Sequence, residues 1–287
     1  KPEQVIAVYE RLLERVRPLP GVRDAGLMRS LPLGTTIGDR GLMVEGYTPP
    51  PGLSAKGDWQ VVSTGALEAI GEKLVRGRRL QASDGLDAPQ VALINETMAQ
   101  AYWPGQDPIG RRIRQGGPTR PWITVVGIVA DVRHNGLEVA IKEKFYRPHT
   151  QWPLSTGNAI RNMHLVVKSE RDPIALVPSI RAEVQAIDPR LPIANIRTMD
   201  EVVAASMSQP RLAQSVLVIF GVLALALAAI GLYGVLSYVV SERNHEIGIR
   251  MAIGAEPRGV RTMVMRQGLM LSLTGIVAGV VVSLALA

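Results

Sequence analysis

The spacing of apolar residues at the N-terminus predicts an amphipathic helix. In PEQVIAVYERLLERV, residues 2–16, apolar side chains recur at intervals of three and four. Pro18 and the Pro20-Gly21 pair end this pattern, and an extended segment begins at Val22.

A second copy of this pattern lies near the end of the polar part of the chain. Residues 172–187, DPIALVPSIRAEVQAI, predict another amphipathic helix, which ends at Asp188-Pro189. A strand over 163–167 precedes it, and a further strand is predicted to open at Leu191-Pro192-Ile193. Two such units around a long insertion predict one α+β subdomain built from both ends of residues 1–210.

The insertion, residues 46–160, is richer in turns and short strands. The apolar runs that predict strands cover 59–63, 91–95 and 122–129. The segment NETMAQAYW predicts a short helix with Asn95 as its N-cap. The run Pro49-Pro50-Pro51-Gly52 is compatible with a linker between subdomains and equally with a surface loop inside one domain.

An uncharged stretch separates Arg211 from Glu242, and its core, residues 215–240, is almost wholly apolar. At about 1.5 Å per residue it exceeds the roughly 30 Å hydrocarbon core of a bilayer, so it predicts a membrane span within 212–240. A buried helix of a soluble protein is less favoured, because such helices seldom run so far without a polar face. After Arg266 the chain is again uncharged to Ala287, which predicts a second, truncated span over 267–287. The start at Lys1 and the stop inside an apolar run suggest a fragment of a longer membrane protein.

The distribution of arginines predicts the orientation in the membrane. The loop 241–266 carries five arginines, whereas residues 200–214 before the first span carry only Arg211. The positive-inside rule places the loop in the cytoplasm and residues 1–210 outside the inner membrane.

The amino-acid composition argues against several classes of protein. With 47% hydrophobic and 20% charged residues the chain buries a core easily, which excludes a disordered protein. Aromatic residues make up only 4%, which argues against a nucleic-acid reader that stacks bases, in spite of the net charge of +7. The absence of cysteine excludes zinc fingers, thiol catalysis and disulfide frameworks.

The candidate metal-binding and phosphate-binding motifs lack the required residues at the required spacing. No catalytic, cofactor or metal site is therefore predicted. His245-Glu246 begins like a zinc-protease motif, but Ile249 stands where the second histidine is needed. Residues 65–73, GALEAIGEK, lack the Lys-Ser/Thr ending of a phosphate loop. The remaining histidines, His134, His149 and His164, are expected to be solvated or to cap helices.

Two basic clusters and two sets of small residues each allow two interpretations. The clusters are predicted to form a solvated sheet edge, with anionic lipid head groups as the alternative ligand; they comprise Arg76, Arg78, Arg79, Arg111, Arg112 and Arg114. Small residues at helical spacing predict close helix packing, either between protomers or within one chain, at Gly221, Ala224, Ala228, Gly231, Gly275 and Gly279.

The loop after the first span predicts a docking surface. If the helix continues through SERNHEIGIR, then Glu242, Glu246 and Arg250 lie on one face, with Glu246 and Arg250 in the favourable order for an ion pair. Gly254 suits the end of that helix. A charged helix at the inner membrane surface is typical of a contact with a partner protein.

At these residues the sequence resembles the FtsX-like permease family of ABC transporters, which includes MacB, LolC and LolE. The family motif resembles E-R-x-x-E-I-G-I-R-x-A-x-G-A, and the matching positions are Glu242, Arg243, Glu246, Ile247, Gly248, Ile249, Arg250, Ala252, Gly254 and Ala255. Upstream, segments such as VALINETMAQAYWPGQDPIGRRI and VVGIVADVRHNGL resemble the MacB-like periplasmic core domain.

This resemblance implies a fold and a set of partners. Family members have one membrane helix, a large extracytoplasmic domain and three more helices. They work as dimers with a cytoplasmic ATPase that holds the ATP. The implied map has a porter-like subdomain (1–45 and 161–210), an inserted Sabre-like subdomain (46–160) and an FtsX-like region (211–287) with its coupling loop at 241–266. A homodimer or pseudo-dimer, membrane lipids and a periplasmic adaptor are the further partners expected, and nucleic acid is not.

Three functional classes stay open on the sequence. The resemblance favours a non-catalytic permease that exports or extracts an amphiphilic or peptide-like substrate. The alternative is a regulatory member like FtsX, which activates an extracytoplasmic cell-wall hydrolase without moving cargo. A membrane enzyme or sensor unrelated to ABC systems is the third class.

Overall fold

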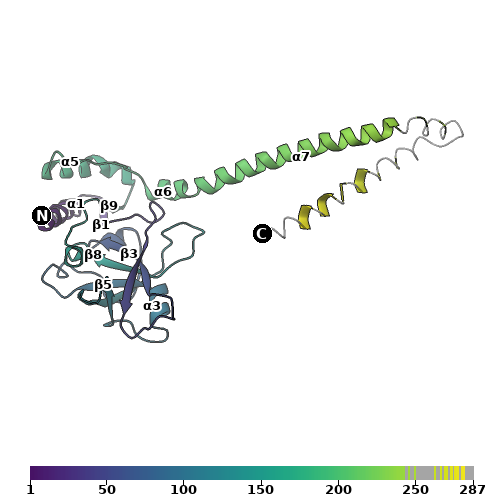
Figure 1. Cartoon of the computed structure of the whole chain (residues 1–287). Coiled ribbons are helices and arrows are strands. Elements are labelled where there is room, and N and C mark those ends of the chain that lie inside the picture. The colour runs from purple at the N-terminus through teal and green to yellow at the C-terminus, as the bar shows by residue number, and fades with distance from the viewer. Residues whose placement is uncertain are drawn as a thin grey trace. The chain divides into compact units, whose positions relative to one another are not determined.

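The computed structural model describes residues 1–242 and, beyond them, 245, 249, 262, 266, 268–270, 272–273, 275–277 and 279–281. For residues 208–214 and 239–240 it describes the backbone alone. The chain divides into two units, Lys1–Ser208 and Gln209–Ala287. Figure 1 shows the first as helices packed on strands and the second as a long helix followed by shorter helical pieces.

The first unit has an α+β fold, as predicted. Its helices are α1 (Pro2–Val16), α2 (Ala66–Ala69), α3 (Glu96–Tyr102), α4 (Trp152–Thr156), α5 (Val177–Ile187), preceded by the 3-10 turn η1 (Pro173–Leu176), and α6 (Met199–Ser206). Its strands are β1 (Val22–Met28), β2 (Asp39–Val44), β3 (Lys56–Val62), β4 (Leu74–Gly77), β5 (Val91–Asn95), β6 (Arg112–Gln115), β7 (Ile123–Val129), β8 (Lys144–Pro148) and β9 (His164–Ser169).

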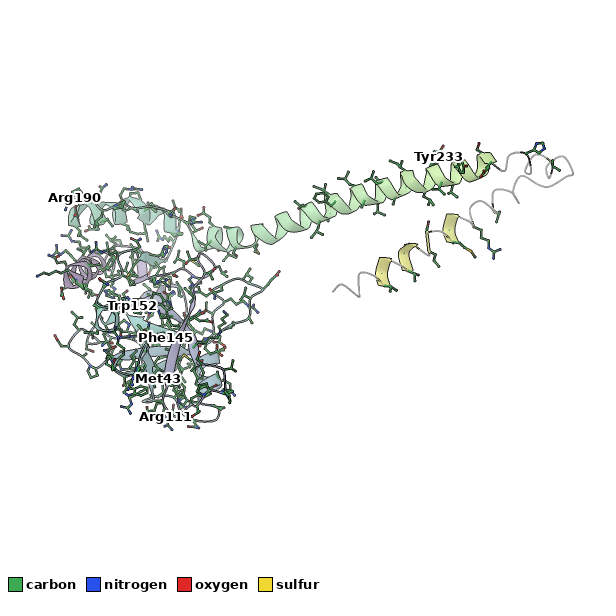
Figure 2. The ribbon with its side chains drawn as sticks, viewed as in Figure 1. Met43, Arg111, Phe145, Trp152, Arg190 and Tyr233 are labelled. Carbon is green, nitrogen blue, oxygen red and sulfur yellow. The ribbon has the colours of Figure 1, made fainter. Side chains whose placement is uncertain are left out.

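Six strands of this sheet close into a ring. The hydrogen-bonded order runs β2-β6-β7-β5-β8-β3, and β3 pairs again with β2, for example Asp58 with Asp39. The run 49–52 therefore lies in the loop that joins two paired strands. The larger core cluster draws on these strands and on α3, and its members include Leu42, Ile94, Met98, Ile113, Val125 and Phe145. Phe145 lies near the middle of the unit in Figure 2.

The two ends of the first unit meet on β1 and β9. These strands pair antiparallel from Val22 with Ser169 to Met28 with His164. The pairing brings α1 and α5 together, and Arg15 of α1 forms an ion pair with Glu183 of α5 at 3.1 Å. The predicted helices and the strands that flank them at 22 and 163–167 are confirmed. The assignment of these parts to porter-like and Sabre-like subdomains stays a prediction.

The strand predicted to open at Leu191 is wrong. Residues 189–198 contain no strand in the structure, and most of their side chains are exposed. Pro189 and Pro192 have no amide hydrogen to donate to a neighbouring strand. Asn195 takes a left-handed φ of 57°, which breaks an extended run. The second copy of the predicted repeat therefore consists of strand β9 and helix α5, without the strand that was expected to follow them.

Two buried ionisable side chains lie near Tyr146, a member of a second core cluster that also includes Met28, Val62 and Leu93. Glu72 and Lys144 are 4% and 3% exposed, and the Tyr146 hydroxyl donates to Glu72 Oε1 at 2.7 Å. Burial raises the pKa of the Glu72 carboxyl to about 7, although Tyr146 and Lys144 act in the opposite direction. The protonated carboxyl is thus favoured in the folded state.

The first unit should fold without the second, because its core clusters and its sheet lie wholly within residues 1–208. Residues 1–208 expressed alone are expected to give a soluble, monodisperse protein with a cooperative unfolding transition, measured by size-exclusion chromatography and circular dichroism. Aggregation, or a non-cooperative melt, would show that the unit depends on the rest of the protein.

Glu72 should make the stability of this unit depend on pH. A carboxyl whose pKa is raised from 4.5 to about 7 stabilises the fold below pH 4.5, and this contribution is lost as the pH rises through 7. We expect the free energy of unfolding to fall by about 1 kcal/mol between pH 6 and 8 through this group. Glu72→Gln should remove that part of the decline in urea titrations, and Glu3→Gln, at an exposed position of α1, should leave it unchanged.

Candidate functional site

The second unit contains a helix that can cross a membrane. Helix α7 (Ser208–Glu242) includes a 24-residue segment, Ser215–Tyr238, with a mean hydropathy of 2.7. Its large apolar side chains are open on every side; Leu217, Leu225 and Tyr233 are each at least 70% exposed. A helix that is apolar all round and unburied suits a lipid environment. Figure 2 shows Tyr233 standing out from α7.

The second predicted span is only partly described. Its described residues between Gly268 and Val281 are helical. Among the described residues, α7 is the one helix long and apolar enough to span a bilayer. A second span over 267–287 stays a prediction.

Small residues form a stripe on α7. Gly221, Ala224, Ala228 and Gly231 recur at helical spacing and are all exposed. A Cβ placed on either glycine would meet no described atom within 4 Å, and the same holds for Gly275 and Gly279. The stripe of α7 is thus open to another helix, and small residues let two backbones approach closely.

The predicted coupling surface begins where α7 ends. Glu242 is the last residue of α7 and is exposed. The other predicted members, Arg243, Glu246, Ile247, Gly248, Arg250 and Gly254, lie outside the described residues. The role of this surface stays a prediction from the sequence.

Four of the six arginines in the basic clusters of the first unit form ion pairs with carboxylates. The ion pairs join Arg76 to Asp107 at 2.8 Å, Arg78 to Asp84 at 2.8 Å, Arg79 to Glu68 at 3.3 Å and Arg112 to Glu45 at 2.6 Å. This arrangement favours the predicted solvated edge over binding of anionic lipid.

Two of the histidines that were expected to be solvated or to cap helices are buried. His134 and His149 are 6% and 5% exposed. Burial, helped by nearby cations, lowers the pKa of His134 to about 3, so its imidazole is neutral. His149 Nε2 lies 3.0 Å from the Glu10 carboxylate and links the end of β8 to α1. Within the described part of the chain no group of three or more candidate ligands could hold a metal ion.

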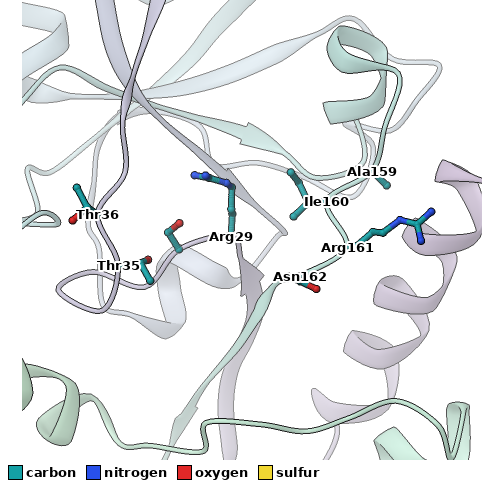
Figure 3. A pocket seen from close by; sticks show the side chains of 8 residues that line it. Arg29, Thr35, Thr36, Ala159, Ile160, Arg161 and Asn162 are labelled. Carbon is teal, nitrogen blue, oxygen red and sulfur yellow. The ribbon is translucent and has the colours of Figure 1, made fainter.

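An open pocket of about 480 Å³ was not predicted from the sequence. Arg29, Thr35, Thr36 and Asn162 contribute polar side chains to its lining. Figure 3 shows the Arg29 side chain pointing toward the segment that carries Thr36, whereas the Arg161 side chain points away from it, toward α1. These residues come from distant parts of the chain, so no local motif marks them.

An α+β domain followed in sequence by a helix long and apolar enough to cross a membrane is typical of a membrane-anchored protein. The model of the MacB-like periplasmic core domain matches residues 7–183, and that of the FtsX-like permease C-terminal domain matches residues 218–287. The chain therefore belongs to the family of MacB-like and FtsX-like ABC transporter permeases.

Two curated relatives and one solved structure illustrate what the chain is similar to. The macrolide export ATP-binding/permease protein MacB of Mannheimia succiniciproducens is 24% identical over 84% of this chain and 38% of its own length. The probable syringafactin export ATP-binding/permease protein SyfD of Pseudomonas syringae is 26% identical over 85% of this chain and 37% of its own length. The chain thus spans less than two-fifths of these curated relatives. The crystal structure of the periplasmic region of MacB from Actinobacillus actinomycetemcomitans aligns with a TM-score of 0.45 and 16% identity, over 63% of this chain and 73% of that structure.

The open stripe of α7 predicts a contact between protomers. These 287 residues contain no cysteine, so Ala224→Cys and Ala228→Cys are the reactive thiols in this region once any cysteine elsewhere in the full-length protein has been replaced by serine. Both are expected to yield crosslinked dimers in membranes. Ala226→Cys, on the opposite face of the helix, is the matched control and should not crosslink. Equal crosslinking at Ala226, or none at Ala224 and Ala228, would place the protomer contact elsewhere.

Proposed function

We propose that this chain is the permease part of a MacB- or LolE-type ABC transporter in the inner membrane. In this proposal residues 1–210 lie in the periplasm, and a cytoplasmic ATPase drives their movement to export or extract an amphiphilic or peptide-like substrate. The order of the two family matches along one chain supports it, as do the relatives whose names describe export.

The observation that carries the proposal is the continuity of α7. This one helix runs for 35 residues, from the end of the first unit to Glu242, the first residue of the family motif. At about 1.5 Å per residue it is longer than the hydrocarbon core. A continuous helix is stiff along its axis, so a displacement imposed at the Glu242 end reaches the Ser208 end.

The permease itself needs no catalytic group for this role. We infer that ATP binds to a separate chain or to a part of the protein beyond the matched region, since the curated relatives are much longer and are named as ATP-binding proteins. The permease would act as a homodimer or pseudo-dimer among membrane lipids, with a periplasmic adaptor as a further partner.

The coupling surface is proposed to lie on Glu242, Glu246 and Arg250. Exposed ion pairs contribute well under about 1 kcal/mol to stability, so stability alone does not account for such a charged cluster. Anionic lipid attracts the arginines but repels a glutamate. Glu246 would instead form ion pairs with basic residues that line a groove on the ATPase.

Reversing this charge should uncouple the transporter. In the full-length protein with its ATPase, Glu246→Lys is expected to leave insertion and the periplasmic fold intact while transport falls by about tenfold or more, the scale on which lost charge pairs at interfaces act. Glu3→Lys makes the same reversal at an exposed position of α1 and should have no effect. Should Glu246→Lys still co-purify with the ATPase and keep full transport, the coupling role would be rejected.

A further inference from the structure

Two arginines of the first unit gather on one pair of tryptophans. The rings of Trp59, in β3, and Trp152, at the start of α4, stack in parallel at 4.5 Å. The guanidinium of Arg29, the residue after β1, lies over Trp59 at 3.7 Å from the ring centre. The guanidinium of Arg40, in β2, lies 4.6 Å from the Trp59 ring and 5.6 Å from the Trp152 ring.

This cluster carries positive charge that no carboxylate balances. Within residues 1–242 neither Arg29 nor Arg40 forms an ion pair, unlike Arg76, Arg78, Arg79 and Arg112 of the basic clusters. The two guanidinium groups lie closer to each other than the Debye length of about 10 Å at 0.1 M salt. Burial, and then the charge of Arg40, lowers the pKa of Arg29. An anion bound beside Arg29 would reduce this repulsion.

The nearest carboxylates in sequence are occupied elsewhere. Asp39 pairs with Lys56 at 2.8 Å and lies 3.7 Å from Lys142. Asp58 accepts a hydrogen bond from Asn135 at 2.9 Å. Since successive side chains of a strand point to opposite faces, these two aspartates face away from Arg40 and Trp59, their neighbours in sequence.

The hydrogen-bonding capacity of Arg29 is also unused. Its Nη1 is buried and has no partner within the described structure. Arg40 donates only to a neutral group: with the Gln115 amide oxygen turned toward it, the distances are 3.2 and 3.3 Å. The Trp59 ring restricts the guanidinium of Arg29, so a ligand in the pocket would meet a cation that is already positioned and has no competing carboxylate.

Arg29 also lines the open pocket of about 480 Å³ described above. The hydroxyl groups of Ser30, Thr35 and Thr36 and the amide of Asn162 lie around the same space. A guanidinium fork surrounded by several neutral donors suits a tetrahedral oxyanion, which presents acceptor oxygens in several directions. Figure 3 shows these side chains around the pocket.

We propose that this pocket is a binding site for a phosphate oxyanion, held by Arg29 and by the neighbouring charge of Arg40. The phosphate can be a dissolved ion or the head group of an anionic lipid, since both present the same oxygens. The site lies within residues 1–208 and does not depend on the transport role proposed above.

The test follows tryptophan fluorescence of the full chain in neutral detergent at constant ionic strength. The probes are inorganic phosphate and dihexanoyl phosphatidylglycerol, with dihexanoyl phosphatidylcholine as the zwitterionic control. We expect a saturable response in which Arg29→Met weakens binding by about tenfold or more and Arg40→Met weakens it less. Arg23→Met, at an exposed arginine of β1, should leave the affinity within about twofold of the original value.

The outcomes separate the sources of phosphate and keep the proposal falsifiable. A response to inorganic phosphate supports a site for the dissolved ion, and a response to phosphatidylglycerol alone supports a lipid head group. Arg29→Lys keeps the charge but loses the fork, so it should weaken binding even if Arg29→Met fails to fold by circular dichroism. The proposal is overturned if the unaltered chain gives no saturable response to either probe, or if the folded Arg29 and Arg40 variants bind as tightly as it does.

Discussion

The antiparallel pairing of β1 with β9 sets the layout of the first unit. It joins residues 22–28 to residues 164–169 across the whole insertion. Closing so long a loop costs only a little more entropy than closing a shorter one, because the cost grows with the logarithm of length. Burial of Ala25, Leu27 and Val166 along the pair offsets that cost. The pairing also fixes α1 next to α5.

One glycine on this pair carries a strict steric requirement. A Cβ on Gly26 would lie 2.2 Å from the backbone nitrogen of Ala66, so only glycine lets α2 pack directly on β1. Because the contact is with backbone, it has no flexible side chain to move aside. The insertion is therefore held to the end pair by strand hydrogen bonds and by this close approach.

The sequence predicted those elements whose pattern is local. The periodic helices α1 and α5, the apolar runs of β5 and β7, and the Asn95 cap, whose Oδ1 accepts from the Met98 amide at 3.0 Å, all follow from neighbouring residues. Strand β8, KFYRP, was missed because it is fully buried although it contains Lys144 and Arg147. Arg147 donates to Ser155 and Gln90 at 2.7 Å each, and Lys144 Nζ donates to the Val132 carbonyl at 3.3 Å. No periodicity reveals these contacts.

Among the functional features, too, those encoded in one segment could be predicted and those assembled from distant segments could not. The membrane helix α7 was predicted because the bilayer sets its length and its composition, and both can be read from a single segment. The predicted strand at Leu191 failed because the repeat pattern does not supply a partner strand, and Pro189 and Pro192 have no amide hydrogen to donate to one. The cluster of Arg29, Arg40 and two tryptophans assembles only when the ring of strands closes, so it required the structure.

The proposed function requires that ATP hydrolysis moves residues 1–208. Ala182 is exposed on α5, so a spin label on Ala182→Cys in the full-length transporter reports the distance between the two protomers by double electron–electron resonance. The account predicts one distance distribution without nucleotide and a clearly different one after trapping with ATP and vanadate. An unchanged distribution in a preparation that hydrolyses ATP and transports substrate would contradict it.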